Sequence, residues 1–238
     1  TRLFDRQGSR ISLTEAGKLL LEHCERILED YKRLEYEMHL LHNEYTGGLK
    51  LGASTTVAQY VLPPLLASFI GKFPHVNLSL LNGNSREIEA ALQEHRIDLG
   101  FVEGVFRLPN SKYTTFLKDE LVAVVRTGSK LAIGEEITPE ELLHLPLVLR
   151  ERGSGTLDVF ERALQQHNIK LSSLQVLMYL GSTESIKLFL EHTDCLGIVS
   201  IRSITRELYS GQLRVVEIKD MPMLRDFSFA QPQGQESG

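Results

Sequence analysis

The sequence has few of the residues that mark a disulfide scaffold, a metal centre or a membrane protein. Its 238 residues include two cysteines, Cys24 and Cys195, which match no metal-binding or redox spacing. Isolated thiols of this kind are typical of reduced cysteines in a cytosolic protein. No apolar run approaches the roughly 18 residues of a membrane span, and residues 1–10 show no signal peptide. We therefore expect a cytoplasmic protein without a membrane partner.

Common catalytic motifs are also missing. There is no P-loop and no Gly-x-Gly-x-x-Gly pattern. Gly153-Ser154-Gly155 has the composition of a nucleophile elbow without its spacing, and no acid and histidine partners can be assigned to it. His39 and His42 lie one helical turn apart, but an exposed helical pair is usually inert. We expect no enzymatic activity, no metal and no cofactor.

Neither sign of charge is in large excess. The net charge is −5, with 42% hydrophobic and 24% charged residues. This is the composition of a globular protein long enough for one large domain or two small ones. A strongly basic nucleic-acid binder would show the opposite balance, so the bulk charge gives no support for DNA binding.

Residues 1–13 are short and basic. Two strand-like segments, residues 3–6 and 10–13, flank a turn that contains Gly8, a pattern that predicts a β-hairpin. Arg2, Arg6 and Arg10 lie in or beside this hairpin.

Residues 14–45 predict one long helix with Thr14 as N-cap and Gly47-Gly48 after its end. Its apolar positions alternate steps of four and three, the heptad spacing of a helix that packs along another helix. Gly17 weakens this seam or marks a close approach of backbones. The partner could lie in the same chain; we favour a second copy of the chain, because no other comparably long helix is predicted. The dimerisation residues are then Leu20, Cys24, Ile27, Tyr31, Leu34, Met38 and Leu41.

From residue 49 onward, strands and helices alternate, which predicts α/β layers with mainly parallel sheets. The total is large for one sheet, so we expect two linked lobes. The predicted strands are 49–53, 76–81, 97–102, 113–117, 121–126, 147–150, 175–180, 196–200, 213–218 and 226–230. The predicted helices are 57–69, 85–95, a short one from 138, 156–167, 184–192 and 204–209.

Three turns rich in Gly, Ser and Thr follow a predicted strand and precede a predicted helix. They lie at residues 52–56, 153–156 and 181–183. Each places hydroxyls and free N–H groups at the positive end of a helix, which suits a carboxylate, phosphate or sulfate. Because carboxyl ends of parallel strands share a crevice, the turns could converge there. Ordinary helix capping is the alternative.

These turns supply most of the candidate effector-binding residues. Arg150 precedes the second turn and could grip an anion through two nitrogens, or could be an ordinary surface group. Glu103 and Thr127 follow strand ends, where cleft residues tend to lie. The full set is Ser54, Thr55, Glu103, Thr127, Arg150, Ser154, Gly155, Thr156, Ser182 and Thr183.

Residues 3–17 contain Leu-Phe-Asp-Arg and, after a gap, Leu-Thr-Glu-Ala-Gly. They resemble the wing and the start of the linker helix in LysR-type transcription regulators, whose pattern there is LF-x-R, a gap, then LT-x-AG. Residues 49–52, 62–74, 97–100 and 197–200 resemble segments of that family's sensor domain. Residues 150–156, RERGSGT, are similar to a loop in a branch whose members often sense small anionic metabolites.

The resemblance covers nearly the whole chain and implies an α/β fold. It implies two Rossmann-like lobes of the periplasmic-binding-protein type, preceded by a long dimerisation helix and a remnant of a winged helix-turn-helix domain. The expected boundaries are 1–13 for the wing, 14–46 for the linker helix, 48–126 with 225–238 for lobe I, and 127–224 for lobe II.

The resemblance also implies a mechanism. The effector binds between the lobes, and a homodimer or homotetramer presents DNA-binding heads to promoter DNA. Arg6 and Arg10 fall on the wing, where phosphate contacts are expected. Ser54, Thr55, Thr127, Ser154 and Thr156 fall on cleft-lining positions. The recognition helix should precede Thr1, so residues 1–238 alone are not expected to read a DNA sequence.

Two other functions remain open from the residues. A periplasmic solute-binding protein would share the lobes and the anion-binding turns, but it would not explain the wing-like segment or the heptad helix. An enzyme built on the same lobes would need a catalytic constellation, and none is found.

Overall fold

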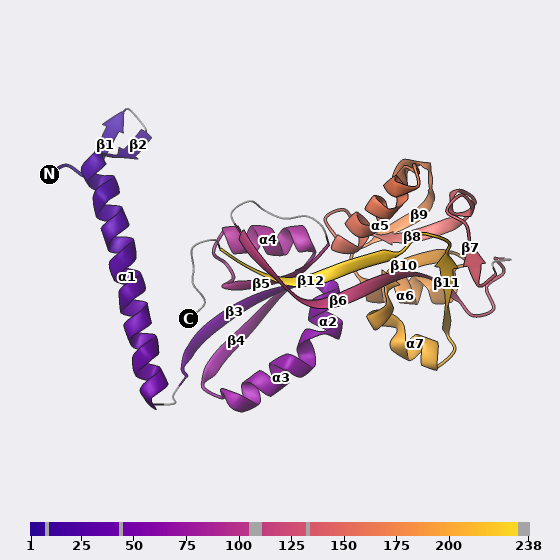
Figure 1. Ribbon diagram of the computed structural model, residues 1–238, viewed down its shortest axis with the longest axis horizontal. Coiled ribbons are helices and arrows are strands. Elements are labelled where there is room, and N and C mark those ends of the chain that lie inside the picture. The colour runs from indigo at the N-terminus through magenta and orange to yellow at the C-terminus, as the bar shows by residue number, and fades with distance from the viewer. Residues whose placement is uncertain (8–9, 43–44, 105–110, 132–133, 233–238) are drawn as a thin grey trace. The chain divides into compact units, whose positions relative to one another are not determined.

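The computed structural model describes residues 1–7, 10–42, 45–104, 111–131 and 134–232 (Figure 1). The chain divides into two compact units between Gly47 and Gly48.

The first unit contains the predicted hairpin and long helix. Strands β1 (Phe4–Gln7) and β2 (Arg10–Leu13) pair antiparallel, and α1 spans Glu15–His42. The Thr14 hydroxyl accepts a hydrogen bond from the Gly17 backbone N at 3.0 Å, which confirms the predicted N-cap. A Cβ atom on Gly17 would overlap the Leu3 carbonyl oxygen, so this glycine allows the start of the chain to pack on the helix.

The predicted seam of α1 lies on the surface of this unit. Exposed side chains include Leu20, Cys24, Ile27, Tyr31, Leu34 and Met38. Each leucine or isoleucine among them leaves about half or more of its surface in contact with solvent. The side chains of Leu41, Arg6, Arg10, His39 and His42 lie outside the described part of the structure. An apolar stripe of this length on one helix is typical of a surface that packs against another helix.

A mixed sheet forms the centre of the second unit. Its strand order is β4-β3-β5-β12-β6-β10-β8-β9, with β11 beside β6 and β7 beside β11. The bounds are β3 (Gly47–Ser54), β4 (Val76–Gly83), β5 (Leu99–Glu103), β6 (Ser111–Arg126), β7 (Glu136–Ile137), β8 (Pro146–Arg150), β9 (Gln175–Leu180), β10 (Leu196–Ser200), β11 (Leu213–Ile218) and β12 (Met223–Pro232).

Parallel pairing occurs at both ends of this sheet and antiparallel pairing at its middle. β3 is parallel to β5, and β10, β8 and β9 are parallel to one another. Between them, β12 and β6 pair antiparallel over ten residues of β12. We call the part with β3–β5 lobe I and the part with β7–β11 lobe II; β6 and β12 run through both (Figure 1).

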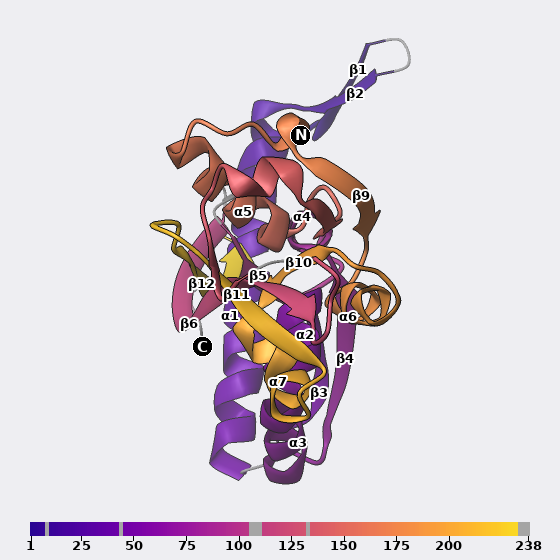
Figure 2. The same ribbon diagram turned by 90° about the vertical axis from the view of Figure 1, so that its right-hand side faces the viewer.

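Helices cover both faces of each lobe. Lobe I carries α2 (Thr55–Tyr60), α3 (Leu62–Lys72) and α4 (Ser85–Gln93). Lobe II carries α5 (Gly155–Gln166), α6 (Thr183–His192) and α7 (Thr205–Tyr209). Lobe II also contains 3-10 turns at Glu141–His144, Leu171–Ser173 and Ile201–Ile204. In both views α5 lies on one side of β10, and α6 and α7 lie on the other (Figure 1 and Figure 2). This layering is the α/β arrangement that the alternation predicted.

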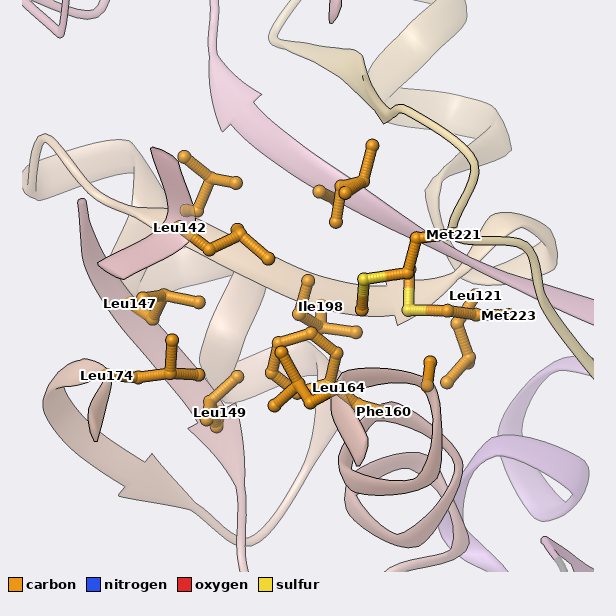
Figure 3. Packing of buried hydrophobic residues seen from close by; sticks show 14 of the residues in the cluster. Leu121, Leu142, Leu147, Leu149, Phe160, Leu164, Leu174, Ile198, Met221 and Met223 are labelled. Atoms are coloured by element: carbon orange, nitrogen blue, oxygen red, sulfur yellow. The ribbon is translucent and has the colours of Figure 1, made fainter. Parts of the chain in front are cut away.

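The largest core lies between α5 and the lobe II strands. Phe160 and Leu164 are fully buried one turn apart on α5, next to Leu149 of β8 and Ile198 of β10 (Figure 3). Their spacing places them on one face of the helix. This core fixes the start of α5, and with it the turn at residues 153–156.

Two elements differ from the sequence-based expectation. The helix expected over 57–69 is divided at Val61 into α2 and α3, and Pro63 and Pro64 stand in the first turn of α3. Proline lacks the N–H that a continuous helix needs there, so the chain starts a new helix instead. The strands expected at 113–117 and 121–126 are one strand, β6, because both parts pair with neighbours in the same sheet.

Candidate functional site

The carboxyl ends of the parallel strands in the two lobes face one another. β3 and β5 end at Ser54 and Glu103, and β8 ends at Arg150. Thr55, directly after β3, accepts a hydrogen bond from Arg150 at 3.4 Å. In open α/β sheets, ligands bind beyond these strand ends. A binding site is therefore expected at this junction.

A hollow of about 300 Å³ lies at this junction. It is lined by Thr55, Gln59, Asn82, Gly83, Asn84 and Glu87 from lobe I, and by Glu151, Gly181 and Ser182 from lobe II. Hydroxyl, amide and carboxylate groups dominate this lining. The first and third predicted turns therefore meet at one polar hollow.

Arg150 lies directly behind the lining. It is 1% exposed, and its Nη2 donates to Thr55 Oγ1, to Gly181 O at 3.3 Å and to Glu151 Oε1 at 3.0 Å. Its Nε donates to Glu151 Oε2 at 2.8 Å. Nη1 has no hydrogen-bond partner among the described residues, and neither does the buried Ser54 hydroxyl. Buried polar groups are normally paired, so these two unpaired atoms, one of them on the guanidinium that bonds residues of the lining, are candidates for contact with a ligand.

The other residues of the three turns cap helices or pack at the junction. Ser154 accepts hydrogen bonds from Thr156 N and Leu157 N, and Ser182 accepts one from Ser185 N at 3.1 Å. Thr183 is buried at the start of α6. Capping was the alternative interpretation of these turns, and for Ser154 and Ser182 the structure shows it. Ser182 still lines the hollow.

Gly155 allows the two lobes to approach closely. A Cβ atom there would overlap the carbonyl oxygen of Glu103. The second turn thus packs directly on the end of β5, where any larger residue would force the backbones apart.

A buried ionic network continues from this contact. Glu103 Oε1 accepts hydrogen bonds from Thr56 at 3.2 Å and Thr156 at 3.4 Å, and lies 3.3 Å from Arg225 Nη1. Arg225 also bonds Thr156 Oγ1 at 3.0 Å and Asp119 Oδ2 at 2.7 Å. The three charged side chains are at most 1% exposed. The network therefore joins β5, β6, β12 and α5 where the lobes meet.

A second link between the lobes lies beside the hollow. The Tyr60 hydroxyl of α2 donates a hydrogen bond to Glu184 of α6, and Lys187 pairs with Glu184 at 2.8 Å. Burial, followed by the bond to Glu184, raises the pKa of Tyr60. Burial alone would raise the pKa of Glu184, but the hydrogen bonds from Lys187 and Tyr60 outweigh it and lower that pKa. Glu184 is therefore held in its ionised form.

This link gives stability a pH dependence. The folded-state pKa of Glu184 lies below its ordinary value of 4.5, so its contribution is present above that value and is lost as the pH falls through the folded-state pKa. We expect Glu184→Gln to cost no more than about 1 kcal/mol near pH 7, because the side chain is partly exposed. The difference from wild type should shrink as the pH falls below 4.5 and through the folded-state pKa of Glu184, as urea titrations at several pH values would show. A difference that grows as the pH falls would contradict the assignment.

Thr127 does not join the other candidates. β6 runs antiparallel to β10, with Leu121 opposite Ser200. The carboxyl end of β6 therefore lies at the amino end of β10, away from the edge that carries Arg150. Thr127 is exposed there, and its N–H bonds Gln212 O. Thr127 was expected in the cleft because it follows a strand end, but cleft residues are found at the carboxyl ends of the parallel strands.

Several residues at the junction were not identified from the sequence. Asp119 and Arg225 lie opposite each other on β6 and β12. Each occupies an inward-facing position of its strand. Arg225 alternates with the buried residues Met223 and Phe227 on the same face of β12. A charged residue in a buried register was a detectable sign of an internal ion pair. Tyr60 and Glu184 had no such sign, since only the fold brings them together.

The parallel strands of two lobes, the two crossing strands and the polar hollow define a two-lobed small-molecule-binding fold of the periplasmic-binding-protein type. The model of the LysR substrate binding domain matches residues 42–238. The chain belongs to the LysR-type transcriptional regulators, and so to a family of regulators and not of enzymes.

Similar proteins agree with this assignment. The HTH-type transcriptional regulator YeiE of Escherichia coli K12 is 34% identical over 217 residues, which are 91% of this chain and 71% of YeiE. The HTH-type regulator CysL of Bacillus subtilis is 25% identical over 96% of this chain and 76% of CysL. The Synechocystis CcmR regulatory domain, solved in complex with 2-PG, superposes with a TM-score of 0.72 at 27% identity, over 81% of this chain and 91% of that domain.

Neither a metal site nor a membrane-spanning helix is found among the described residues. Their His, Cys, Asp and Glu side chains form no group of three or more that could hold a metal ion. Among the described helices, none combines the length and the hydropathy needed to cross a bilayer.

Proposed function

We propose that this chain senses a small anion in the hollow between its lobes and, within a complete regulator, couples that binding to promoter DNA. Arg150 is the observation that carries the proposal. A fully buried guanidinium with one nitrogen unpaired among the described residues is a costly feature in a protein without a ligand. An anion in the hollow would supply negative charge and acceptor oxygens to this guanidinium.

The neighbouring groups suit the same ligand. Ser182 places a hydroxyl at the hollow, and so does Thr55, whose hydroxyl donates to Gly83 O at 3.1 Å and accepts from Arg150. The Ser54 hydroxyl, from the residue before Thr55, is buried without a partner among the described residues. Hydroxyls and a guanidinium are the donors that carboxylates, phosphates and sulfates accept from. CcmR, a relative with the same fold, is seen in complex with 2-PG, which supports a small-molecule ligand for this chain.

We assign different roles to the other candidate residues. Ser154 and Thr183 hold the starts of α5 and α6, and Glu103, Gly155 and Thr156 hold the two lobes together behind the ligand. We also propose 48–126 with 225–238 as the boundaries of lobe I and 127–224 as those of lobe II, with β6 and β12 crossing between the lobes.

We further propose that the chain works as a homodimer or homotetramer in the cytoplasm, paired through the exposed seam of α1. The HTH-type regulators YeiE and CysL support DNA as the partner of the complete protein. In this arrangement Arg6 and Arg10 contact phosphates of the promoter. Ligand binding would shift the lobes and thereby the DNA-binding heads.

A thermal-shift screen tests the sensor. The probes are sulfate, inorganic phosphate and shikimate. A ligand at 100 times its Kd should stabilise the folded chain by about 2.7 kcal/mol. Arg150→Gln should abolish the ligand-induced shift, whatever its effect on the ligand-free melting temperature. Arg152→Gln is the matched control, because Arg152 is the exposed arginine of the same segment and its loss should leave the shift in place. Equal shifts in wild type and Arg150→Gln would refute the proposal.

A further inference from the structure

We infer that the Glu151 carboxylate is a built-in competitor for the anionic effector: it occupies the two-nitrogen edge of Arg150, and the effector binds by displacing it. This inference rests on the proposed function, because it takes Arg150 as the anion-binding group. It adds a residue that sets the affinity and the chemical class of the ligand.

The contacts of Arg150 carry the inference. Its Nε and Nη2 donate to the two oxygens of Glu151, at 2.8 and 3.0 Å, in a fork-to-fork geometry. This is the arrangement in which arginine binds a ligand carboxylate or two oxygens of a phosphate. The Nε/Nη2 edge, which could bind an anionic effector in the same way, is therefore already filled by a side chain of the same protein.

The Glu151 carboxylate can move out of the hollow, whereas the Arg150 guanidinium is held in place. The Glu151 side chain is 26% exposed and lines the hollow, whereas Arg150 is 1% exposed and is also bonded to Thr55 and Gly181. The backbone of Glu151 is fixed, because its N–H bonds Leu180 O and its carbonyl accepts from Ser154 N. The carboxylate can therefore rotate into solvent while the guanidinium stays in place.

Competition with the Glu151 carboxylate determines which class of ligand can bind Arg150. A neutral molecule cannot replace a carboxylate next to a buried guanidinium without leaving that charge uncompensated. A ligand with one oxygen directed at Arg150 would recover only one of the two bonds. The hollow should thus favour ligands with two oxygens on one acidic group, and should bind them more weakly than a hollow without Glu151.

The test is a calorimetric titration of wild type and Glu151→Gln with sulfate and with inorganic phosphate. Glutamine is nearly the same size but lacks the charge, so the anion displaces a weaker partner. We expect Glu151→Gln to bind the anion about tenfold more tightly or better, because a hydrogen bond to a charged group contributes at least that factor. Glu151→Asp, whose shorter side chain keeps the charge but reaches less far, should lie between the two.

Glu87→Gln is the matched control. Glu87 lines the same hollow, but its carboxylate accepts from Asn84 N in the capping box of α4 instead of bonding Arg150. Glutamine also serves in a capping box, so the fold of α4 is kept. The variant removes the same charge from the hollow and should raise the anion affinity much less than Glu151→Gln does.

The outcomes separate the two claims. If Glu151→Gln binds the anion at least tenfold more tightly than both wild type and Glu87→Gln, the competitor role is supported. If wild type binds the anion and Glu151→Gln binds it equally tightly or more weakly, the competitor role is wrong and the anion site remains. Binding by neither protein would overturn both claims.

Discussion

Replacing Arg225 with methionine is expected to lower the free energy of unfolding by about 3–5 kcal/mol, the usual cost of removing one partner from a buried ion pair. Arg225 bonds both buried carboxylates at the junction, those of Asp119 and Glu103. Methionine fills a similar volume but leaves both carboxylates buried without their guanidinium. Urea denaturation, followed by far-UV circular dichroism, would measure the loss.

Arg202→Met provides the matched control. Arg202 also approaches Asp119, at 3.5 Å, but 41% of its side chain is exposed. Because exposed ion pairs contribute little, its loss should cost no more than about 1 kcal/mol. If the two variants lose the same stability, the buried network does not hold the lobes together in the way described.

The second large effect is expected on the oligomeric state. Ile27→Asp should convert the proposed dimer to monomers, raising the dissociation constant on the order of 100-fold or more, because each dimer would bury two carboxylates without partners. Leu34→Asp should act in the same way. Both side chains lie in the exposed seam of α1, at 65% and 57% exposure. Sedimentation equilibrium of residues 1–238 over a range of concentrations would give the constants.

Arg26→Asp is the control for this prediction. Arg26 precedes Ile27 in the sequence but lies outside the seam, where its guanidinium is 4.0 Å from the Glu22 carboxylate. An added carboxylate there stays in water and should leave the dimer intact. Ile27→Asp and Leu34→Asp proteins that sediment as wild type does would show that α1 is not the dimerisation surface.

The features that the sequence predicted correctly are those with a local cause. The hairpin, α1 and its cap at Thr14 follow from turn residues, heptad spacing and a capping hydroxyl. The three turns were found because Gly, Ser and Thr cluster between a strand and a helix. Their meeting at one junction followed from the rule that parallel strands share a carboxyl edge, and Thr55 and Ser182 do meet there.

The features that it missed depend on pairing between distant segments. Thr127 was misplaced because the direction of β6 against β10 is not visible in the strand itself. The bond between Tyr60 and Glu184 joins residues 124 positions apart. The sequence shows that Glu151 follows Arg150, but it does not predict contact between their side chains, because adjacent residues in a strand usually point to opposite faces. Only the end of β8, where the strand turns, lets the two side chains meet.

The most direct test is a crystal structure of the chain soaked with selenate, whose selenium atom can be located by anomalous scattering. We predict a selenium peak in the hollow lined by Thr55 and Ser182, with oxygens on the Nε and Nη2 atoms of Arg150 and the Glu151 side chain turned away. If saturating selenate leaves this hollow empty and the Arg150–Glu151 pair unchanged, both the anion site and the competitor role of Glu151 are contradicted.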